Sequence, residues 1–324
     1  MFNRNLRLFT FQGIPVEINI SWLILLALVT WSFATGFYPE SYPGLFGAVG
    51  LWIISLLTAV MLFLSILIHE FSHSLVAARG GLPINKITLF MFGGVAQMGH
   101  EVEEPSLELR MAAAGPLMTL VLIGIFLGGS LLARGYPPLS ILLGTTGAIN
   151  IGIFIFNMVP GFPLDGGRIL RAAIWKRTGD VRKATRIAAG TGKAFSYLLM
   201  AGGAFNFLVF GNRVSGIWMF LIGMFLRQAA QKSLQQVVRK KSLGEMTVGE
   251  IMRTDIPAWE IAEKSPARSP VHPEDPAWTL FVPLMQRGES MVLVTGMDGR
   301  LAGVVTRRDY SALLDVMAGF GARR

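Results

Sequence analysis

The sequence contains no cysteine and little charge. Without cysteine the chain can form no disulfide, and no thiolate can bind a metal ion. Only 15% of its 324 residues are charged, whereas 52% are hydrophobic and the mean hydropathy is +0.53. A soluble domain of this length carries far more charge. The composition therefore indicates a membrane protein without disulfides.

Six uncharged runs lie in the first 230 residues of the chain. The first five can each supply the roughly 20 residues that cross a bilayer as a helix. The sixth is short, and it spans only if it continues past Arg227 to Ala230. We therefore predict about six transmembrane helices. The runs are Ile18–Pro39, Ser41–Ile68, Met111–Ala133, Gly135–Leu164, Ala194–Asn212 and Val214–Leu226.

The basic residues predict how these spans are oriented. The formal net charge of +9 is spread beside the apolar runs, which indicates membrane-flanking loops and no nucleic-acid partner. With the amino terminus inside, the outer loops hold only Arg134 and Arg213. The inner segments hold many more, with seven basic residues from Arg168 to Arg186 alone. This asymmetry follows the positive-inside rule and predicts a multi-pass cell-membrane protein with both termini in the cytosol.

The second run is followed by two histidines and a glutamate in the sequence HEFSH. His69 and His73 are four residues apart, so a helix places both imidazoles on one face. Two ring nitrogens can then reach one tetrahedral metal ion, while Glu70 reaches a metal-bound water as general base. Titratable groups inside a span are costly and are functional by default. The pattern predicts a metal site on this helix.

A catalytic zinc site usually has three protein ligands and one open position. The chain offers no third histidine in a span, so a carboxylate must complete the set. Asp165 follows the fourth run at its inner end, at the depth expected for His69. Because Asp-Gly-Gly is also good turn chemistry, spacing alone leaves open whether Asp165 is a ligand or a turn residue.

The segment NMVPGFPLDGGRILRA, from Asn157 to Ala172, together with HEFSH closely resembles the site-2 protease family of intramembrane zinc metalloproteases. That family carries HExxH on one transmembrane helix and N-x-x-P-x-x-P-L-D-G-G on a later one, and the aspartate is its third metal ligand. Asn157, Pro160, Pro163 and Asp165 match this pattern one for one. The segments Phe92–Met98 and Glu108–Leu117 extend the resemblance, which covers most of residues 10–235.

The resemblance implies one Zn²⁺ per chain, held by His69, His73 and Asp165, with Glu70 as the catalytic base. Asn157 would stabilise the oxyanion formed during attack on a peptide carbonyl, or it would make an interhelical hydrogen bond. The segment Asn85–Glu101 would form a short membrane-embedded β-hairpin near the site. It would pair with an unwound substrate or serve only as a re-entrant packing element.

Two further features of the membrane region are predicted from the sequence. Met118 and Thr119 stand where family members often carry asparagine after Gly-Pro, so no site role is assigned there. An acidic cluster lies between the second and third spans. We interpret it as a solvated loop, with guidance of a basic substrate segment as the alternative. The cluster comprises Glu101, Glu103, Glu104 and Glu108.

Residues 239–324 predict a separate small α/β module in the cytosol. Two apolar runs, Met291–Thr295 and Leu301–Thr306, flank an Asp-Gly turn, and a helix from Asp309 is expected to follow. This unit, with its GVVTRRD sequence, resembles a CBS domain. The resemblance implies an adenine nucleotide held by Thr306 and Asp309, or a purely structural role. Since only one copy of the motif is present, a pair would require a homodimer formed through this tail.

The sequence thus predicts two domains, a transmembrane metalloprotease domain (1–238) and a regulatory CBS-like domain (239–324). The predicted activity is hydrolysis of a peptide bond in or near the transmembrane segment of a single-span membrane protein, with zinc-bound water activated by Glu70. The alternative is a metal-binding transporter or scaffold without protease activity, controlled by the tail. A transporter should show repeated halves, which the chain lacks, and a pseudoenzyme would be expected to lose Glu70.

Overall fold

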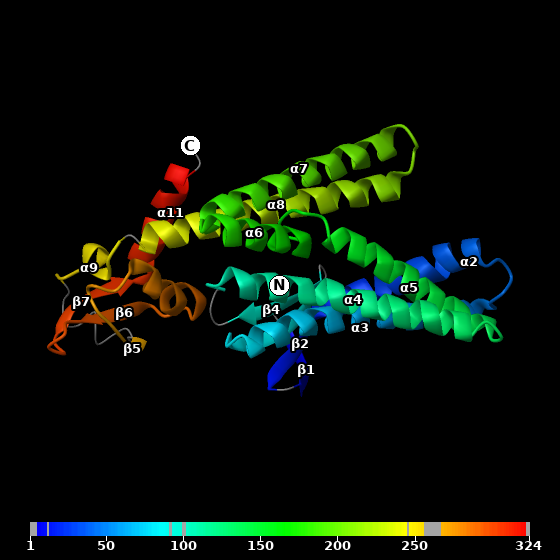
Figure 1. The fold of residues 1–324 in the computed structure, drawn as a ribbon, viewed down its shortest axis with the longest axis horizontal. Helices are drawn as coiled ribbons and strands as arrows, with labels where there is room; N and C mark the ends of the chain where they lie inside the picture. The colour runs from blue at the N-terminus through cyan, green and yellow to red at the C-terminus, as the bar shows by residue number, and fades with distance from the viewer. Residues whose placement is uncertain are drawn as a thin grey trace. The chain divides into compact units, whose positions relative to one another are not determined.

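The structure, a computed structural model, describes residues 5–11, 13–90, 93–98, 102–244, 246–255 and 267–321 (Figure 1). The chain divides into two compact units, Met1–Ala230 and Gln231–Arg324. This division and the boundary predicted at residue 238 both fall inside one helix, Arg213–Gly244. The domain boundary predicted from the sequence therefore stays a prediction. Glu101 of the acidic cluster lies outside the described residues.

The first unit begins with a four-stranded sheet of order β1-β2-β3-β4. Strands β1 and β2 are antiparallel, β2 and β3 are parallel, and β3 and β4 are antiparallel. The hairpin of β3 and β4 lies where the sequence predicted one, whereas β1 and β2 were not predicted. The strands are β1 (Asn5–Phe11), β2 (Ile14–Asn19), β3 (Ile84–Phe90) and β4 (Gly93–Met98).

The two faces of this sheet differ in polarity. Strand β2 alternates strictly between buried and half-buried residues, and its buried side chains pack against Leu67 and Ile87. On the polar face, Lys86 Nζ donates a 2.8 Å hydrogen bond to Glu17 Oε2. This contact lowers the pKa of the Glu17 carboxyl. The period-two pattern of β2 thus directs one face of the sheet toward the helices, while the paired charges of Lys86 and Glu17 lie on the opposite face.

Four helical segments are long and apolar enough to cross a membrane: Ile20–Ser41, Ala48–Arg79, Pro105–Leu132 and Pro137–Asn157. They coincide with the first four predicted spans. The first combines α1 (Ile20–Ser32), η1 (Phe33–Phe37) and α2 (Tyr38–Ser41), and the others are α3 (Ala48–Arg79), α4 (Pro105–Leu132) and α5 (Pro137–Asn157).

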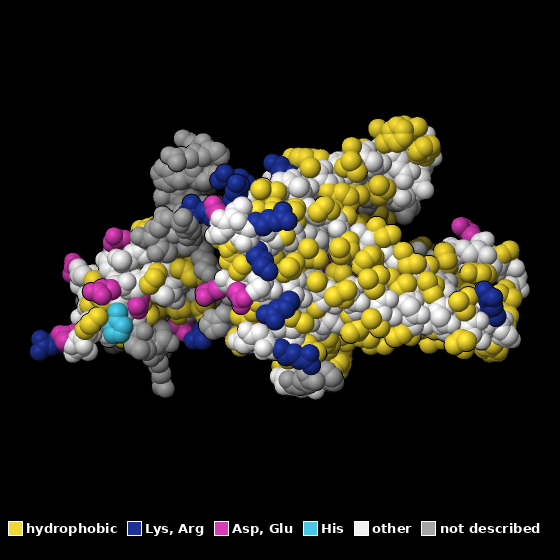
Figure 2. Space-filling model, in the orientation of Figure 1, with side chains coloured by type: hydrophobic (Ala, Val, Ile, Leu, Met, Phe, Trp, Pro, Cys, Tyr) yellow, Lys and Arg dark blue, Asp and Glu magenta, His cyan; other side chains and the backbone are white. Residues whose placement is uncertain are grey.

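Helices α3, α4 and α5 pack side by side (Figure 1). Helix α3 continues well beyond Ile68, where the predicted run ended, so the HEFSH residues lie inside one unbroken helix. Helices α4 and α5 each begin with proline at the first turn, where the missing N–H group is not needed. The outer surfaces of these helices expose many large apolar side chains, which a bilayer would cover (Figure 2).

Three further helices complete the first unit and lead into the second: α6 (Asp165–Thr178), α7 (Val181–Leu208) and α8 (Arg213–Gly244). Helix α6 ends at Gly179, whose φ of 68° is left-handed, and Asp180 then caps α7 by accepting from the backbone of Arg182 and Lys183. Neither α7 nor α8 is among the four candidate spans. The fifth and sixth spans therefore stay predictions.

The second unit has a three-stranded sheet of order β5-β6-β7, with β5 and β6 parallel and β6 and β7 antiparallel. The predicted strands and their turn are confirmed, and the following helix begins at Arg307, two residues before the predicted Asp309. Its elements are α9 (Val248–Ile251), β5 (Ala267–Val271), η2 (Ala277–Leu280), η3 (Val282–Gln286), β6 (Met291–Thr295), β7 (Leu301–Thr306) and α11 (Arg307–Gly321).

Candidate metal centre

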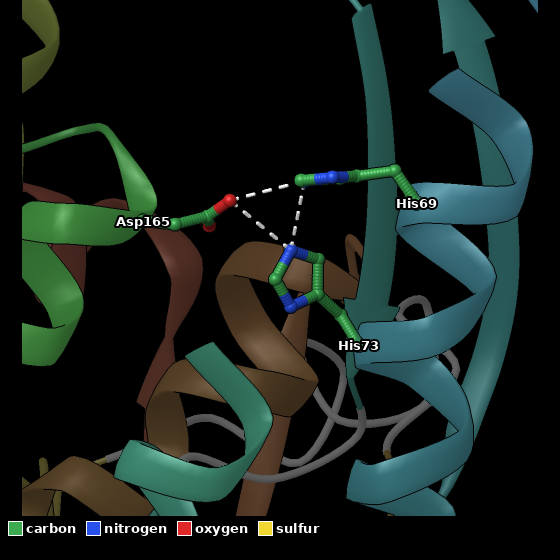
Figure 3. Close-up of side chains that lie close together, drawn as sticks. All are labelled: His69, His73 and Asp165. Atoms are coloured by element: carbon green, nitrogen blue, oxygen red, sulfur yellow. Dashed lines mark hydrogen bonds and ion pairs between the residues drawn. The ribbon is translucent and has the colours of Figure 1, made fainter. Parts of the chain in front are cut away.

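Helix α3 supplies two histidines to a buried polar cluster. His69 and His73 are only 5% and 6% exposed, although they lie on a helix with apolar residues such as Phe63 and Leu67. Their spacing of one helical turn places both rings on the face that packs against α4, and both point toward Asp165 (Figure 3). The predicted pairing of the two imidazoles is therefore present in the fold.

Asp165 reaches the histidines because the chain breaks between α5 and α6. The backbone N–H of Phe162 donates to Ala188 O of α7 at 2.9 Å, which fixes the connecting segment 158–164. A Cβ at Gly166 would lie 2.4 Å from Met158 O, and one at Gly167 would lie 2.2 Å from the backbone of the same segment. Only glycine allows this approach, so the Asp-Gly-Gly sequence folds Asp165 into the cluster.

The three side chains converge on one point (Figure 3). Asp165 Oδ2 lies 3.0 Å from His69 Nε2 and 3.3 Å from His73 Nε2, and the two nitrogens are 3.1 Å apart. Tetrahedral ligands at the zinc–nitrogen distance of about 2.0–2.1 Å stand roughly 3.3–3.4 Å from one another. The observed triangle needs to open by only a few tenths of an ångström, so the donor set fits a zinc ion.

Hydrogen bonds from α4 orient both imidazoles. His73 Nδ1 lies 2.7 Å from Met111 O, which can only accept, so Nδ1 carries the proton. His69 Nδ1 lies 2.9 Å from Thr119 Oγ1, whose own hydrogen goes to Gly115 O at 3.1 Å. In both rings the proton on Nδ1 leaves the Nε2 lone pair free toward Asp165. This is the tautomer that a metal ligand requires.

Gly115 of α4 sits directly against the two rings. A Cβ there would lie 2.3 Å from His73 Nε2 and 2.6 Å from His69 Nε2. Because glycine has no side chain, the two Nε2 atoms can occupy this space. From the sequence, no site role was assigned to Gly115 or to Thr119. Their spacing from Met111, four and eight residues, is the signal that could have found them.

Glu70 and Asn157 flank the cluster without belonging to it. Glu70 follows His69 on α3 and is half-buried, and its carboxylate makes no hydrogen bond to the described part of the chain. Asn157 is the last residue of α5 and is half-buried. Its amide likewise has no hydrogen-bond partner among the described residues. The interhelical bond from α5 is made instead by Asn150, which donates to Ser65 Oγ at 3.2 Å.

A partly buried ion pair connects α4 to α6. Glu108 is fully buried, and its Oε1 accepts from Arg171 Nε at 2.7 Å and also from Arg171 Nη2. The Arg171 guanidinium lies over the Phe162 ring, 5.0 Å from its centroid. The interpretation of Glu108 as part of a solvated loop is therefore wrong, because this residue lies inside the first turn of α4. Glu103 and Glu104, which precede the helix, are exposed.

In the second unit, Thr306 and Asp309 contact each other. Thr306 Oγ1 donates to Asp309 Oδ2 at 2.6 Å and accepts from the Asp309 backbone N–H at 3.2 Å, an arrangement that caps α11. A cavity of about 210 Å³ lies beside them, lined by Ile251, Val305, Asp309, Tyr310 and Leu313. This volume is below the roughly 300 Å³ at which ligand pockets begin. The cavity does not enclose a whole nucleotide.

Comparison with known proteins agrees with this geometry. The family model for peptidase family M50 matches residues 57–146 and 138–200, a region that contains every residue of the metal cluster. The protein Rip3 of Mycobacterium tuberculosis is 33% identical over 91% of this chain and 72% of its own length. The protein sll0528 of Synechocystis is 36% identical over 79% of this chain and 66% of its own. The names of both class them as zinc metalloproteases.

A zinc metalloprotease of Methanocaldococcus jannaschii, MJ0392, is 34% identical over 72% of this chain and 62% of its own length. Among solved structures, a site-2 protease from the same organism matches 71% of this chain and 95% of its own, with 31% identity and a TM-score of 0.48. The family-model match and the identity to Rip3 show that the chain belongs to peptidase family M50, a family of zinc metalloproteases. This confirms the family resemblance found in the sequence.

Proposed function

We propose that the protein is an intramembrane zinc endopeptidase that cuts a peptide bond in or near a transmembrane segment of a membrane-bound substrate. The observation that carries the proposal is the triangle of His69 Nε2, His73 Nε2 and Asp165 Oδ2, with edges of 3.0–3.3 Å, buried among membrane-crossing helices. Two neutral imidazoles and one carboxylate are the donor set of a catalytic zinc with an open position.

Zinc, when bound by these three residues, supplies Lewis acidity that acidifies water and polarises a carbonyl group. Glu70 then takes the proton of the attacking water and passes it to the leaving amine. Its place next to His69 and the absence of a hydrogen-bond partner among the described residues leave its carboxylate free for this role. Asn157, whose amide is similarly free, donates to the oxyanion.

The proposed topology has six spans with both termini in the cytosol, and α7 and α8 form the last two. Both helices expose large apolar side chains along their length, among them Leu198, Phe205, Leu208, Trp218 and Met224. Figure 2 shows Lys and Arg side chains gathered at one end of the apolar surface of the first unit, the end at which α6 lies. This band supports a cytosolic location for that end.

The hairpin of β3 and β4 is proposed to be embedded in the membrane near the metal site. There it would pair with the unwound segment of a single-span substrate. Strand β4 is the last strand of its sheet order and therefore has one edge without a partner strand in the described chain. An unwound substrate segment could add there by backbone hydrogen bonds, a common way to hold an extended peptide.

The second unit is proposed to regulate the protease as a CBS-like module, in which Thr306 and Asp309 contact an adenine nucleotide. The small cavity beside them supports a site for part of such a ligand only. A homodimer formed through this unit would supply the remaining contacts from a second copy. Equilibrium dialysis of AMP and ATP with the purified full chain tests the nucleotide, and Asp309→Ala should abolish any binding that uses this site.

The decisive experiment compares the wild type with Glu70→Gln and His69→Ala after purification in detergent. Zinc content is measured by elemental analysis, and cleavage of single-span substrates is followed by gel electrophoresis. We expect about one zinc in the wild type and in Glu70→Gln, little in His69→Ala, and cleavage by the wild type alone. Equal cleavage by Glu70→Gln would remove this glutamate from the mechanism. Zinc binding without cleavage by any variant would favour the transporter or scaffold.

A further inference from the structure

Two cations and one tyrosine form a cluster between α7 and α8, far along the chain from the zinc ligands. The Arg227 guanidinium carbon lies 5.4 Å from the centroid of the Tyr197 ring, and Lys193 Nζ lies 6.0 Å from the same centroid. The ring face attracts each cation, whereas the two positive charges repel one another. Tyr197 is 44% exposed, so the cation cluster of Lys193, Tyr197 and Arg227 opens to the surroundings.

Close packing of α7 and α8 holds this cluster in place. A Cβ at Gly223 would lie 2.7 Å from Ser196 O, and a Cβ at Gly216 would lie 2.7 Å from Gly203 O. The two helix backbones are therefore in contact at two places along their interface, as is common for membrane helices with small residues at the interface. Gly223 is one turn before Arg227, and this contact places the arginine beside Tyr197.

The cation cluster has no anion of its own. The sequence contains no Asp or Glu between Asp180 and Glu245. No carboxylate of the described residues lies within ion-pairing distance of Lys193 or Arg227. Two cations that share one aromatic ring without a carboxylate partner favour an anionic acceptor from outside the chain.

The cluster lies where the apolar parts of both helices begin. Lys193 directly precedes the uncharged run that starts at Ala194, and Arg227 directly follows the run that ends at Leu226. Just inside this boundary, Leu198 and Met224 are 68% and 49% exposed. Tyrosine is typical of such a boundary in membrane proteins. Positive charge, an aromatic ring and apolar side chains thus follow one another in the order of a phospholipid headgroup and its chains.

We propose that the cation cluster binds the headgroup phosphate of an anionic phospholipid, with the acyl chains along Leu198 and Met224. The inference rests on the part of the proposed function that makes α7 and α8 membrane spans. The phosphate lies against the Arg227 guanidinium and Lys193 Nζ, and its negative charge offsets the repulsion between the two cations. A free phosphate ion would satisfy the same donors but would leave the apolar side chains without a partner.

The test is native mass spectrometry of the full-length protein in detergent, titrated with phosphatidylglycerol, phosphatidylcholine or inorganic phosphate. At about 1 kcal/mol for each basic residue near an anionic lipid, Lys193→Gln/Arg227→Gln should bind phosphatidylglycerol about 30-fold more weakly. The matched control, Lys183→Gln/Arg186→Gln, removes two charges from the same helix outside the cluster and should change binding less than 3-fold. Equal losses in the two variants would overturn the site, as would binding of inorganic phosphate as tight as that of the lipid.

A separate measurement tests the proposed topology independently of the lipid site. Because the chain has no cysteine, Leu198→Cys carries the only thiol. If α7 spans the membrane, a water-soluble maleimide should not label this thiol in sealed or in opened membrane vesicles, but should label it after denaturation. Labelling in opened vesicles would refute the span and with it the lipid site. A protected thiol with no lipid selectivity would refute the lipid site alone.

Discussion

Substitution of Gly115 by alanine should weaken zinc binding strongly without unfolding the protein. The added methyl carbon would lie 2.3 Å from His73 Nε2 and 2.6 Å from His69 Nε2, whereas contacts with carbon normally begin at about 3.5 Å. Either the rings move by roughly 1 Å or α4 moves away from α3. A displacement of this size is large against the 2.0–2.1 Å zinc–nitrogen bond, and weaker disturbances of such ligands already cost 10- to 100-fold in affinity.

We therefore expect Gly115→Ala to lower zinc affinity by at least about 100-fold. The affinity is measured by competition with a chromogenic chelator, and thermal unfolding in detergent reports on the fold. Gly124→Ala is the matched control, because a Cβ at this glycine of the same helix meets no atom within 4 Å. It should leave zinc affinity unchanged. If Gly115→Ala holds zinc as tightly as the control, the three side chains do not meet as the structure shows, and the proposed metal centre is wrong.

Three further outcomes follow from the structure. Thr119→Val should weaken zinc binding by about 10- to 100-fold, because valine lacks the hydroxyl that accepts the His69 Nδ1–H. Thr119→Ser keeps the hydroxyl and should bind zinc as the wild type does, which a zinc titration of both variants measures. Lys86→Gln should cost less than about 1 kcal/mol of stability near neutral pH. Because Lys86 lowers the Glu17 pKa, this difference should disappear in unfolding curves only as the pH falls through that lowered pKa and the carboxylate is protonated in the folded state. Glu108→Gln should cost up to about 3 kcal/mol in denaturant unfolding, because it leaves the partly buried Arg171 guanidinium without its carboxylate partner. Glu108→Leu/Arg171→Leu removes both charges and should be close to neutral.

The sequence was sufficient for the parts of the protein that depend on local pattern. Four of the six predicted spans coincide with apolar helices, because a long uncharged run permits little else in a bilayer. Strands β6 and β7 of the second unit were found from their alternation and the Asp-Gly turn, whereas β5 was not predicted. Strands β1 and β2 were not found, because β2 leads directly into α1 at Ile20 and its apolar residues merge with the run that follows.

Prediction stopped at contacts between distant segments. His69 and Asp165 are 96 residues apart, and only the family resemblance connected them. Gly115 and Thr119 were overlooked, because a glycine and a threonine inside an apolar helix carry no charge or titratable group that would single them out. Glu108 was misassigned for the opposite reason. Its acidic neighbours suggested a solvated loop, whereas its partner Arg171 lies 63 residues away and appears beside it only in the fold.

Helix α4 explains why a metal site can exist inside this apolar bundle. Buried imidazoles and a buried carboxylate are costly unless each polar atom has a partner. One face of α4 meets this need at successive turns: Met111 O accepts from one histidine, Gly115 leaves room for both rings, and Thr119 accepts from the other. With both Nδ1 protons taken up by α4, the Nε2 atoms and Asp165 have no partners but one another among the described residues. A positive ion is the group that all three can bind.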